Sequence, residues 1–118
     1  MSIDVTRESE EILRRHLQAF IEGDLETILV DYSEDAVLYT PQGPLVGIGE
    51  IRTFFEIVFN NLPHDKIVEK FLMNRQDVVG EIAYIVWSAF PIIDLATDTF
   101  IIRGGKITSH TTAMNVLR

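Results

Sequence analysis

One stretch, DLATDTFIIRGGKITSHTTAMNVL at residues 94–117, decides the fold. Two apolar, threonine-rich segments flank Gly104 and Gly105, and glycine tolerates the positive φ that a tight turn requires. The stretch is therefore predicted to form two long antiparallel β-strands joined at the two glycines. The first strand holds one carboxylate, Asp98, and the second holds one imidazole, His110.

The length of the turn decides whether Asp98 and His110 share a face of the sheet, because side chains alternate faces along a strand. A two-residue turn pairs Arg103 with Lys106 and places Asp98 opposite Thr111. A three-residue turn places Asp98 opposite His110. We favour the three-residue turn because it avoids setting two cations directly opposite each other.

Length and composition bound the remaining possibilities. The chain has 118 residues, which is enough for one domain over residues 1–118 and too few for two. Hydrophobic residues make up 47%, which excludes a disordered chain. Because 18 acidic residues outnumber 10 basic ones, giving a net charge of −8, nucleic acids and anionic membrane surfaces are poor candidate partners.

The sequence contains no cysteine, so disulfides, thiolate nucleophiles and thiolate metal sites are excluded. The charged start MSIDVTRESEEILRR does not resemble a signal peptide, and no apolar run approaches the ~20 residues that span a bilayer. We expect a cytoplasmic protein without membrane contact.

The other elements are predicted from apolar periodicity and capping residues. In order, they are a helix that starts at Thr6 or Ser9 and ends at Gly23, a short helix from Asp24 to Tyr32, a strand over 36–40, a turn over 41–44, a helix over 50–60, a loop over 60–64, and strands over 66–75 and 81–90. This order predicts an α+β fold, in which a strongly curved antiparallel sheet carries three N-terminal helices on its concave side.

The strand over 81–90 is almost continuously apolar, whereas a strand with one face in water alternates apolar and polar residues. We therefore expect its sheet to be covered on both faces, by helices on one side and by a second copy of the chain on the other. Trp87 and Tyr84 lie on opposite faces of this strand, so one of them can line a cavity.

His16 lies on the apolar face of the first helix, one turn from Ile12 and one turn from Phe20. Two interpretations are open for it. It is either a buried histidine satisfied by a carbonyl or hydroxyl, or a hydrogen-bond donor that points into a cavity. His64 is predicted to be a surface residue of the loop over 60–64.

Three segments, HLQAFIEGDLETI, DYSEDAVLYTPQGPLVGIGEIRTFF and DTFIIRGGKITSH, together resemble the nuclear transport factor 2-like superfamily. The resemblance covers roughly residues 8–117 and is strongest for the SnoaL-like polyketide-cyclase and ketosteroid-isomerase branch. It implies a cone-shaped barrel that encloses a deep pocket, and a dimer that packs sheet against sheet. Its motifs are specific for the fold and weak for the reaction.

The resemblance also implies roles for individual residues. The tyrosine donor of the isomerases falls on His16, which Tyr32 would support, and their aspartic acid donor falls on Asp98. Their catalytic aspartate falls on Thr40, which cannot shuttle a proton at neutral pH, so steroid isomerisation is not expected. The implied pocket is lined by Tyr32, Thr40, Phe55, Trp87, Phe100, Thr112 and Met114, beside His110.

An acid/base couple of Asp98 and His110, with His16 opposite, predicts an enzyme of the isomerase, cyclase or dehydratase type. Its substrate would be a small apolar compound with a carbonyl or hydroxyl group, and no cofactor or metal is expected. A metal site built from His16, His110 and Asp98 is a minor alternative. The main alternative is a non-catalytic ligand-binding or dimerisation module that uses the same pocket.

Overall fold

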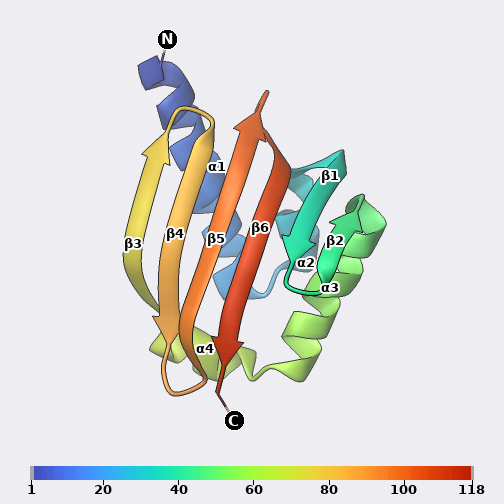
Figure 1. Cartoon of the computed structure of the whole chain (residues 1–118), viewed down its shortest axis with the longest axis vertical. Helices are drawn as coiled ribbons and strands as arrows, with labels where there is room; N and C mark the ends of the chain where they lie inside the picture. The colour runs from blue at the N-terminus through green and yellow to red at the C-terminus, as the bar shows by residue number, and fades with distance from the viewer. Residues whose placement is uncertain (1, 118) are drawn as a thin grey trace.

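The computed structural model describes residues 2–117, in which four helices pack against one face of a six-stranded sheet (Figure 1). In chain order the elements are α1 (Ser2–Glu22), α2 (Leu25–Val30), β1 (Tyr32–Thr40), β2 (Gly43–Val46), α3 (Ile48–Asn61), α4 (His64–Lys70), β3 (Leu72–Val79), β4 (Ile82–Ala89), β5 (Ile93–Arg103) and β6 (Lys106–Val116).

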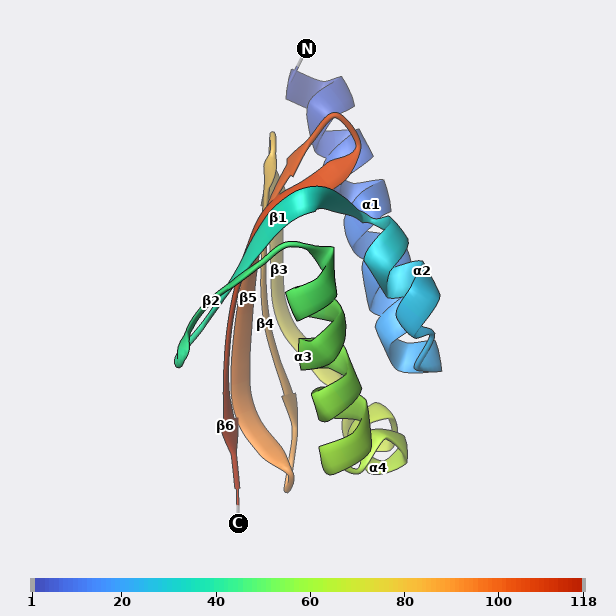
Figure 2. The ribbon, with the colours of Figure 1, turned by 90° about the vertical axis from the view of Figure 1, so that its right-hand side faces the viewer.

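The strands lie in the order β2-β1-β6-β5-β4-β3. All neighbours are antiparallel except β1 and β6, which run parallel. Figure 2 shows that the sheet curves around the helices, which all lie on its concave side. The predicted α+β fold class is confirmed, with the sheet left open between its edge strands β2 and β3.

Three boundaries differ from the prediction. Residues 64–70 form α4 instead of a loop and the start of a strand, because Ile67 is buried against the core. The predicted turn over 41–44 is confined to residues 41–42, and residues 43–46 form β2. Tyr32 begins β1 instead of ending the second helix.

The first helix begins at Ser2, before both of the predicted caps. The hydroxyl groups of Thr6 and Ser9 instead bond the turn between β3 and β4. The Gly80 backbone N–H donates to Thr6 Oγ1 at 2.8 Å, and Ser9 Oγ donates to the Gly80 carbonyl at 2.7 Å. The two hydroxyl groups that were predicted to cap α1 therefore connect α1 to the turn between β3 and β4.

The predicted three-residue turn between the last two strands is wrong. Arg103 pairs with Lys106, so the turn has two residues, Gly104 and Gly105, both with positive φ. The exposed cationic side chains do not have to touch, because Arg103 binds Glu81 and Lys106 binds the carbonyl of Val30.

A β-bulge at Thr108 compensates for the two-residue turn, so that the side chains of Asp98 and His110 still point to the same face of the sheet. Ile102 pairs with Ile107, but Ile101 pairs with Ser109, so Thr108 is an extra residue in β6. Beyond the bulge Asp98 pairs with Thr112 and Phe100 pairs with His110. Asp98 and His110 therefore lie on the same face of the sheet, as diagonal neighbours on adjacent strands.

The concave face of the sheet forms the core with the helices. On β4, Ala83, Ile85, Trp87 and Ala89 are buried, and the residues between them are not. No helix among residues 2–117 is long and apolar enough to cross a bilayer.

Candidate functional site

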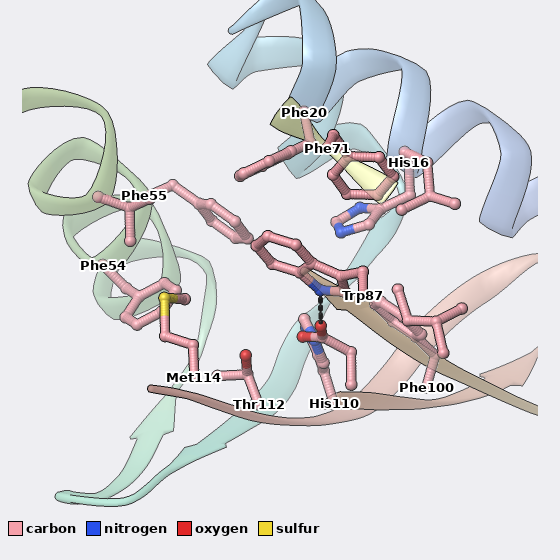
Figure 3. A pocket seen from close by; sticks show the side chains of 14 residues that line it. His16, Phe20, Phe54, Phe55, Phe71, Trp87, Phe100, His110, Thr112 and Met114 are labelled. Carbon is pink, nitrogen blue, oxygen red and sulfur yellow. Dashed lines mark hydrogen bonds and ion pairs between the residues drawn. The ribbon is translucent and has the colours of Figure 1, made fainter. Parts of the chain in front are cut away.

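A cavity of about 40 Å³ lies between the helices and the concave face of the sheet (Figure 3). Its residues come from α1, α3, the segment after α4, and strands β4, β5 and β6. They are His16, Leu17, Phe20, Phe54, Phe55, Val58, Phe71, Ile85, Trp87, Asp98, Phe100, His110, Thr112 and Met114. Ten of these fourteen residues are apolar or aromatic, so the four polar ones, His16, Asp98, His110 and Thr112, determine the chemistry of the cavity.

Asp98 is the only acidic residue in the lining. It points inward from β5 and is 7% exposed. Its Oδ1 lies 2.7 Å from His110 Nε2, and its Oδ2 accepts a hydrogen bond from Trp87 Nε1 at 2.9 Å (Figure 3). Both oxygens of the carboxylate are therefore held by neighbouring strands of the same sheet.

His110 connects this carboxylate to Tyr32. Its Nδ1 lies 2.8 Å from the Tyr32 hydroxyl, and its ring stacks on Phe100 with the centroids 4.1 Å apart. Burial, aided by the charges of Asp98 and Asp31, raises the pKa of Tyr32 well above its ordinary value, so the phenol keeps its proton. The Tyr32 hydroxyl and His110 Nδ1 therefore share one hydrogen bond, and His110 Nε2 donates to the Asp98 carboxylate.

Asp98 remains ionised in this apolar setting. Burial alone would raise the pKa of Asp98, but the hydrogen bond and charge of His110 oppose it, with further hydrogen bonds from Trp87 and Thr112. The net result is a pKa below the ordinary value of 3.8. At neutral pH the cavity wall therefore carries a carboxylate, shielded from bulk water and fixed in orientation.

His16 faces the pair from α1. It is 4% exposed, and burial, followed by the charge of His110, lowers its pKa from 6.5 to about 3. Its Nδ1 is buried without a hydrogen-bond partner. The predicted support of His16 by a hydrogen bond from Tyr32 is wrong, since the Tyr32 hydroxyl bonds His110, and the rings of Tyr32 and His16 meet only in a T-shaped contact. His16 is therefore a neutral, incompletely satisfied ring in the cavity wall.

The geometry separates the roles of these three residues. Both ring nitrogens of His110 are engaged, so His110 positions Asp98 and does not itself face a ligand with a free nitrogen. Asp98 keeps lone pairs that no described donor occupies, because a carboxylate can accept about four hydrogen bonds. An ionised acceptor opposite a neutral imidazole can remove a proton from a bound molecule or hold its hydroxyl group.

The structure brings most of the predicted site residues together. His16, Phe55, Trp87, Asp98, Phe100, His110, Thr112 and Met114 all line the cavity. Tyr32 lies behind His110. Thr40 lines a neighbouring surface hollow.

Six lining residues were not predicted to line the pocket, and they are Leu17, Phe20, Phe54, Val58, Phe71 and Ile85. Four of them belong to the apolar faces of α1 and α3, which gave a signal for burial but not for the cavity. The prediction of His64 as a surface residue is wrong, since it is half-buried and its Nε2 lies 3.1 Å from the Ile21 carbonyl.

The alternative of a metal site finds no support. Residues 2–117 hold no group of three or more side chains placed to bind a metal ion.

Comparison with known proteins identifies relatives at the level of the fold. A family model described as a SnoaL-like domain matches residues 13–110. No curated protein matches the chain.

Solved structures share the architecture at low identity. An NTF2-like protein of unknown function from Burkholderia xenovorans LB400 is 18% identical, with a TM-score of 0.75 over 97% of this chain and 88% of that one. A proposed ketosteroid isomerase from Kribbella flavida DSM 17836 is 12% identical, with a TM-score of 0.71 over 95% and 81%. A de novo designed protein with a curved β-sheet is 13% identical, with a TM-score of 0.71 over 92% and 86%. The designed example illustrates that this fold does not by itself imply an activity.

Proposed function

The chain belongs to the family of SnoaL-like domains, and from that premise we propose that it is an acid/base enzyme acting on a small apolar molecule with a carbonyl or hydroxyl group. One observation carries the proposal. An ionised carboxylate, Asp98, lies in the wall of an apolar cavity, where two donors from neighbouring strands fix it. Burying such a group costs free energy, which a purely structural wall does not require.

The proposed step is the transfer of a proton within the substrate. Asp98 removes the proton from the carbon next to a carbonyl, and the electron pair of the C–H bond moves onto the carbonyl oxygen to give an enolate. Return of the proton to another carbon or to oxygen completes an isomerisation. A fixed base in a site that excludes water contributes typically 10²–10⁴-fold to such a step.

His16 is the candidate for stabilising the developing negative charge. A neutral imidazole has one N–H donor, and its low pKa keeps it neutral throughout the physiological range. Its buried Nδ1 has no protein partner, so a ligand atom would satisfy a group that is otherwise left without a hydrogen bond. Tyr32 and His110 are positioning residues in this scheme, since they act through Asp98.

A second candidate function is ligand binding without reaction. The same hydrogen bonds that fix Asp98 lower its pKa and so make it a weaker base. A carboxylate of this kind is well suited to hold the hydroxyl group of a ligand. The two functions share the cavity and differ in whether Asp98 takes a proton.

Hydrogen exchange in a small ketone tests the proposal. Acetone, which is small enough for the inner cavity, is incubated with the protein in D₂O, and the loss of its α-proton signal is followed by NMR. We expect exchange faster than in buffer, and a loss of at least about 100-fold of that acceleration in Asp98→Asn. The matched control is Asp94→Asn, an exposed aspartate of the same strand, which should exchange like the wild type.

Two results would decide against catalysis. If the wild type binds acetone without accelerating exchange, the binding function is the correct one. If Asp98→Asn accelerates exchange as well as the wild type, Asp98 is not the base.

We also propose a homodimer that packs through the convex face of the sheet. Described helices cover only the other face (Figure 2), and Ile82, Leu95 and Tyr39 are about half exposed on the convex side. An apolar face of this kind supports association with a second copy. Analytical ultracentrifugation at micromolar concentration should give a dimer mass for the wild type and a monomer mass for Leu95→Glu, whereas a monomeric wild type would refute the proposal.

A further inference from the structure

A surface hollow of about 230 Å³ adjoins the cavity that holds Asp98. It lies between the turn after β1, helix α3 and the end of β6, and is lined by Thr40, Pro41, Gln42, Phe54, Val58, Thr112, Ala113 and Met114. Four of these residues, Phe54, Val58, Thr112 and Met114, also line the inner cavity. The two spaces are therefore separated by a partition one side chain thick.

The inner cavity alone is too small for a ring-shaped ligand. Its volume is about 40 Å³, whereas an apolar cavity of roughly 150 Å³ accommodates benzene. A ligand larger than a few atoms must therefore displace part of the wall. The wall residues with empty space behind them can move most easily, because displacement in that direction meets no packed neighbours.

Met114 is the member of the partition best suited to move. Its unbranched side chain has three rotatable bonds and adapts to irregular spaces. It is half-buried near the end of β6 and reaches toward Phe54 of α3 (Figure 3). Phe55 and Trp87, by contrast, are about 95% buried and packed among other rings.

We propose that the cavity and the outer hollow form one ligand site, with Met114 as a movable partition that determines how long a ligand the site accepts. The ligand class is then an elongated apolar molecule with a single hydrogen-bonding end. That end lies at Asp98, an orientation that rests on the proposed function, and the apolar end extends past Met114 toward the turn after β1.

The polarity of the outer hollow fits an apolar end. Its Thr40 hydroxyl is already satisfied, since it donates to the Gly43 carbonyl at 2.9 Å and accepts from the Gln42 backbone N–H at 3.1 Å. The remaining lining includes Pro41, Val58 and Phe54, which offer apolar surface. Gln42 and Thr112 are the other polar residues of the hollow, so most of the surface that this end of the ligand meets is apolar.

Two alcohols that share a head group test this arrangement. Binding of cyclohexanol and 4-butylcyclohexanol is measured by fluorescence of Trp87, which is the only tryptophan of the chain and lines the cavity. The variants are Met114→Ala, which removes the partition, and Leu17→Ala, which enlarges the same cavity on the side of α1 away from the outer hollow. We expect Met114→Ala to bind 4-butylcyclohexanol at least tenfold more tightly than the wild type, and Leu17→Ala to change this affinity less than threefold.

Equal gains for the long alcohol in the two variants would overturn the inference, as would an unchanged ratio of the two affinities in Met114→Ala. A second measurement needs no variant. In the wild type, the butyl methyl group should give nuclear Overhauser effects to the methyl group of Thr40, and contacts confined to Leu17 and its neighbours would refute the continuous site.

The two proposals fail in different ways. If the acid/base function is wrong, the alcohols still bind along Met114 but ketone exchange does not depend on Asp98. If the continuous site is wrong, exchange still depends on Asp98 but Met114→Ala does not favour the longer alcohol.

Discussion

Each of the two walls of the cavity contains a buried histidine, but the two histidines differ in their hydrogen bonding. On the sheet wall, which comprises Trp87, Asp98 and His110 with Tyr32 behind them, both nitrogens of the histidine are hydrogen bonded. On the helix wall, His16 of α1 has a buried Nδ1 without a partner, although its ring centroid lies only 6.0 Å from that of His110. The histidine of the sheet wall thus has both nitrogens hydrogen bonded without a ligand, and the histidine of the helix wall does not.

The two walls differ in what holds their polar groups in place. The sheet wall fixes a charge through bonds between neighbouring strands, so its geometry is set when the sheet forms. The helix wall holds a polar ring whose burial costs free energy in the absence of a ligand. Variants that affect one wall should therefore change stability in a different direction from the corresponding variants of the other wall.

The same substitution in both walls should have the largest effect and the sharpest contrast. His110→Phe leaves the buried Asp98 charge without its main partner and should destabilise the fold by about 3–5 kcal/mol. His16→Phe replaces an unsatisfied ring with an apolar one of similar shape and should be nearly neutral or stabilising. Urea unfolding at pH 7 measures both values, and equal losses would contradict the contrast between the walls.

Acidification should weaken the fold through the helix wall first. Unfolded His16 gains a proton below pH 6.5, but folded His16 stays neutral until about pH 3. The unfolded state then binds more protons, so stability falls as pH falls, by about 1.4 kcal/mol for each unit between these values. The ordinary value of the Asp98 pKa, 3.8, lies below most of this window, so Asp98 adds its own loss only at lower pH.

The measurement is the difference in unfolding free energy between wild type and His16→Phe from pH 6.5 to 5. Because all other groups are common to both proteins, the difference isolates His16. We expect the wild type to lose about 1.6 kcal/mol more than the variant over this range. Parallel curves would mean that His16 takes up a proton in the folded protein as readily as in the unfolded one.

A smaller effect is expected from the residue behind the sheet wall. Tyr32→Phe removes the hydroxyl that bonds His110 Nδ1 and should cost about 1–3 kcal/mol, because a buried ring nitrogen is left without a partner. Phe55→Leu serves as a control, since it alters an aromatic neighbour of Tyr32 without touching the hydrogen bonds. If Tyr32→Phe unfolds at the same urea concentration as the wild type, the hydroxyl is not part of the network.

The smallest predicted effect concerns the bulge that orients the sheet wall. Thr108 Oγ1 donates to the Ile101 carbonyl at 3.2 Å, and Thr108→Val removes this bond while keeping the shape of the side chain. We expect a loss of about 0.5–1.5 kcal/mol. Cross-strand nuclear Overhauser effects should still pair Asp98 with Thr112, and a pairing of Asp98 with Thr111 would show that the hydroxyl sets the register.

The hairpin of β5 and β6 was predicted correctly from the sequence, but its register was not. Alternation and the two glycines predicted the hairpin, and the avoidance of facing cations favoured a three-residue turn. The turn has two residues, but the bulge at Thr108 returns Asp98 and His110 to one face, as that longer turn would have done. A bulge depends on twist and on hydrogen bonds across the sheet, which no local pattern in the sequence reports.

The residues of the candidate site were predicted from the sequence, but their hydrogen-bond partners were not. The strand and helix patterns, together with the resemblance to a known family, led to His16, Asp98 and His110, all of which line the cavity. The resemblance assigned Tyr32 to the wrong histidine, because the partner of its hydroxyl is decided by a strand 78 residues away. The partition at Met114 could not be predicted from the sequence either. It is defined by the empty volumes on its two sides, which depend on the packing of residues that are distant in the sequence.

The most direct test of the contrast between the walls is a long-range ¹H–¹⁵N spectrum of the histidine rings at pH 5, with His16→Phe and His110→Phe used for assignment. We expect His16 to show one protonated and one unprotonated nitrogen, as a neutral ring does, and Nε2 of His110 to carry a proton. Protonation of both nitrogens of His16 at this pH, or an unprotonated Nε2 in His110, would contradict this expectation.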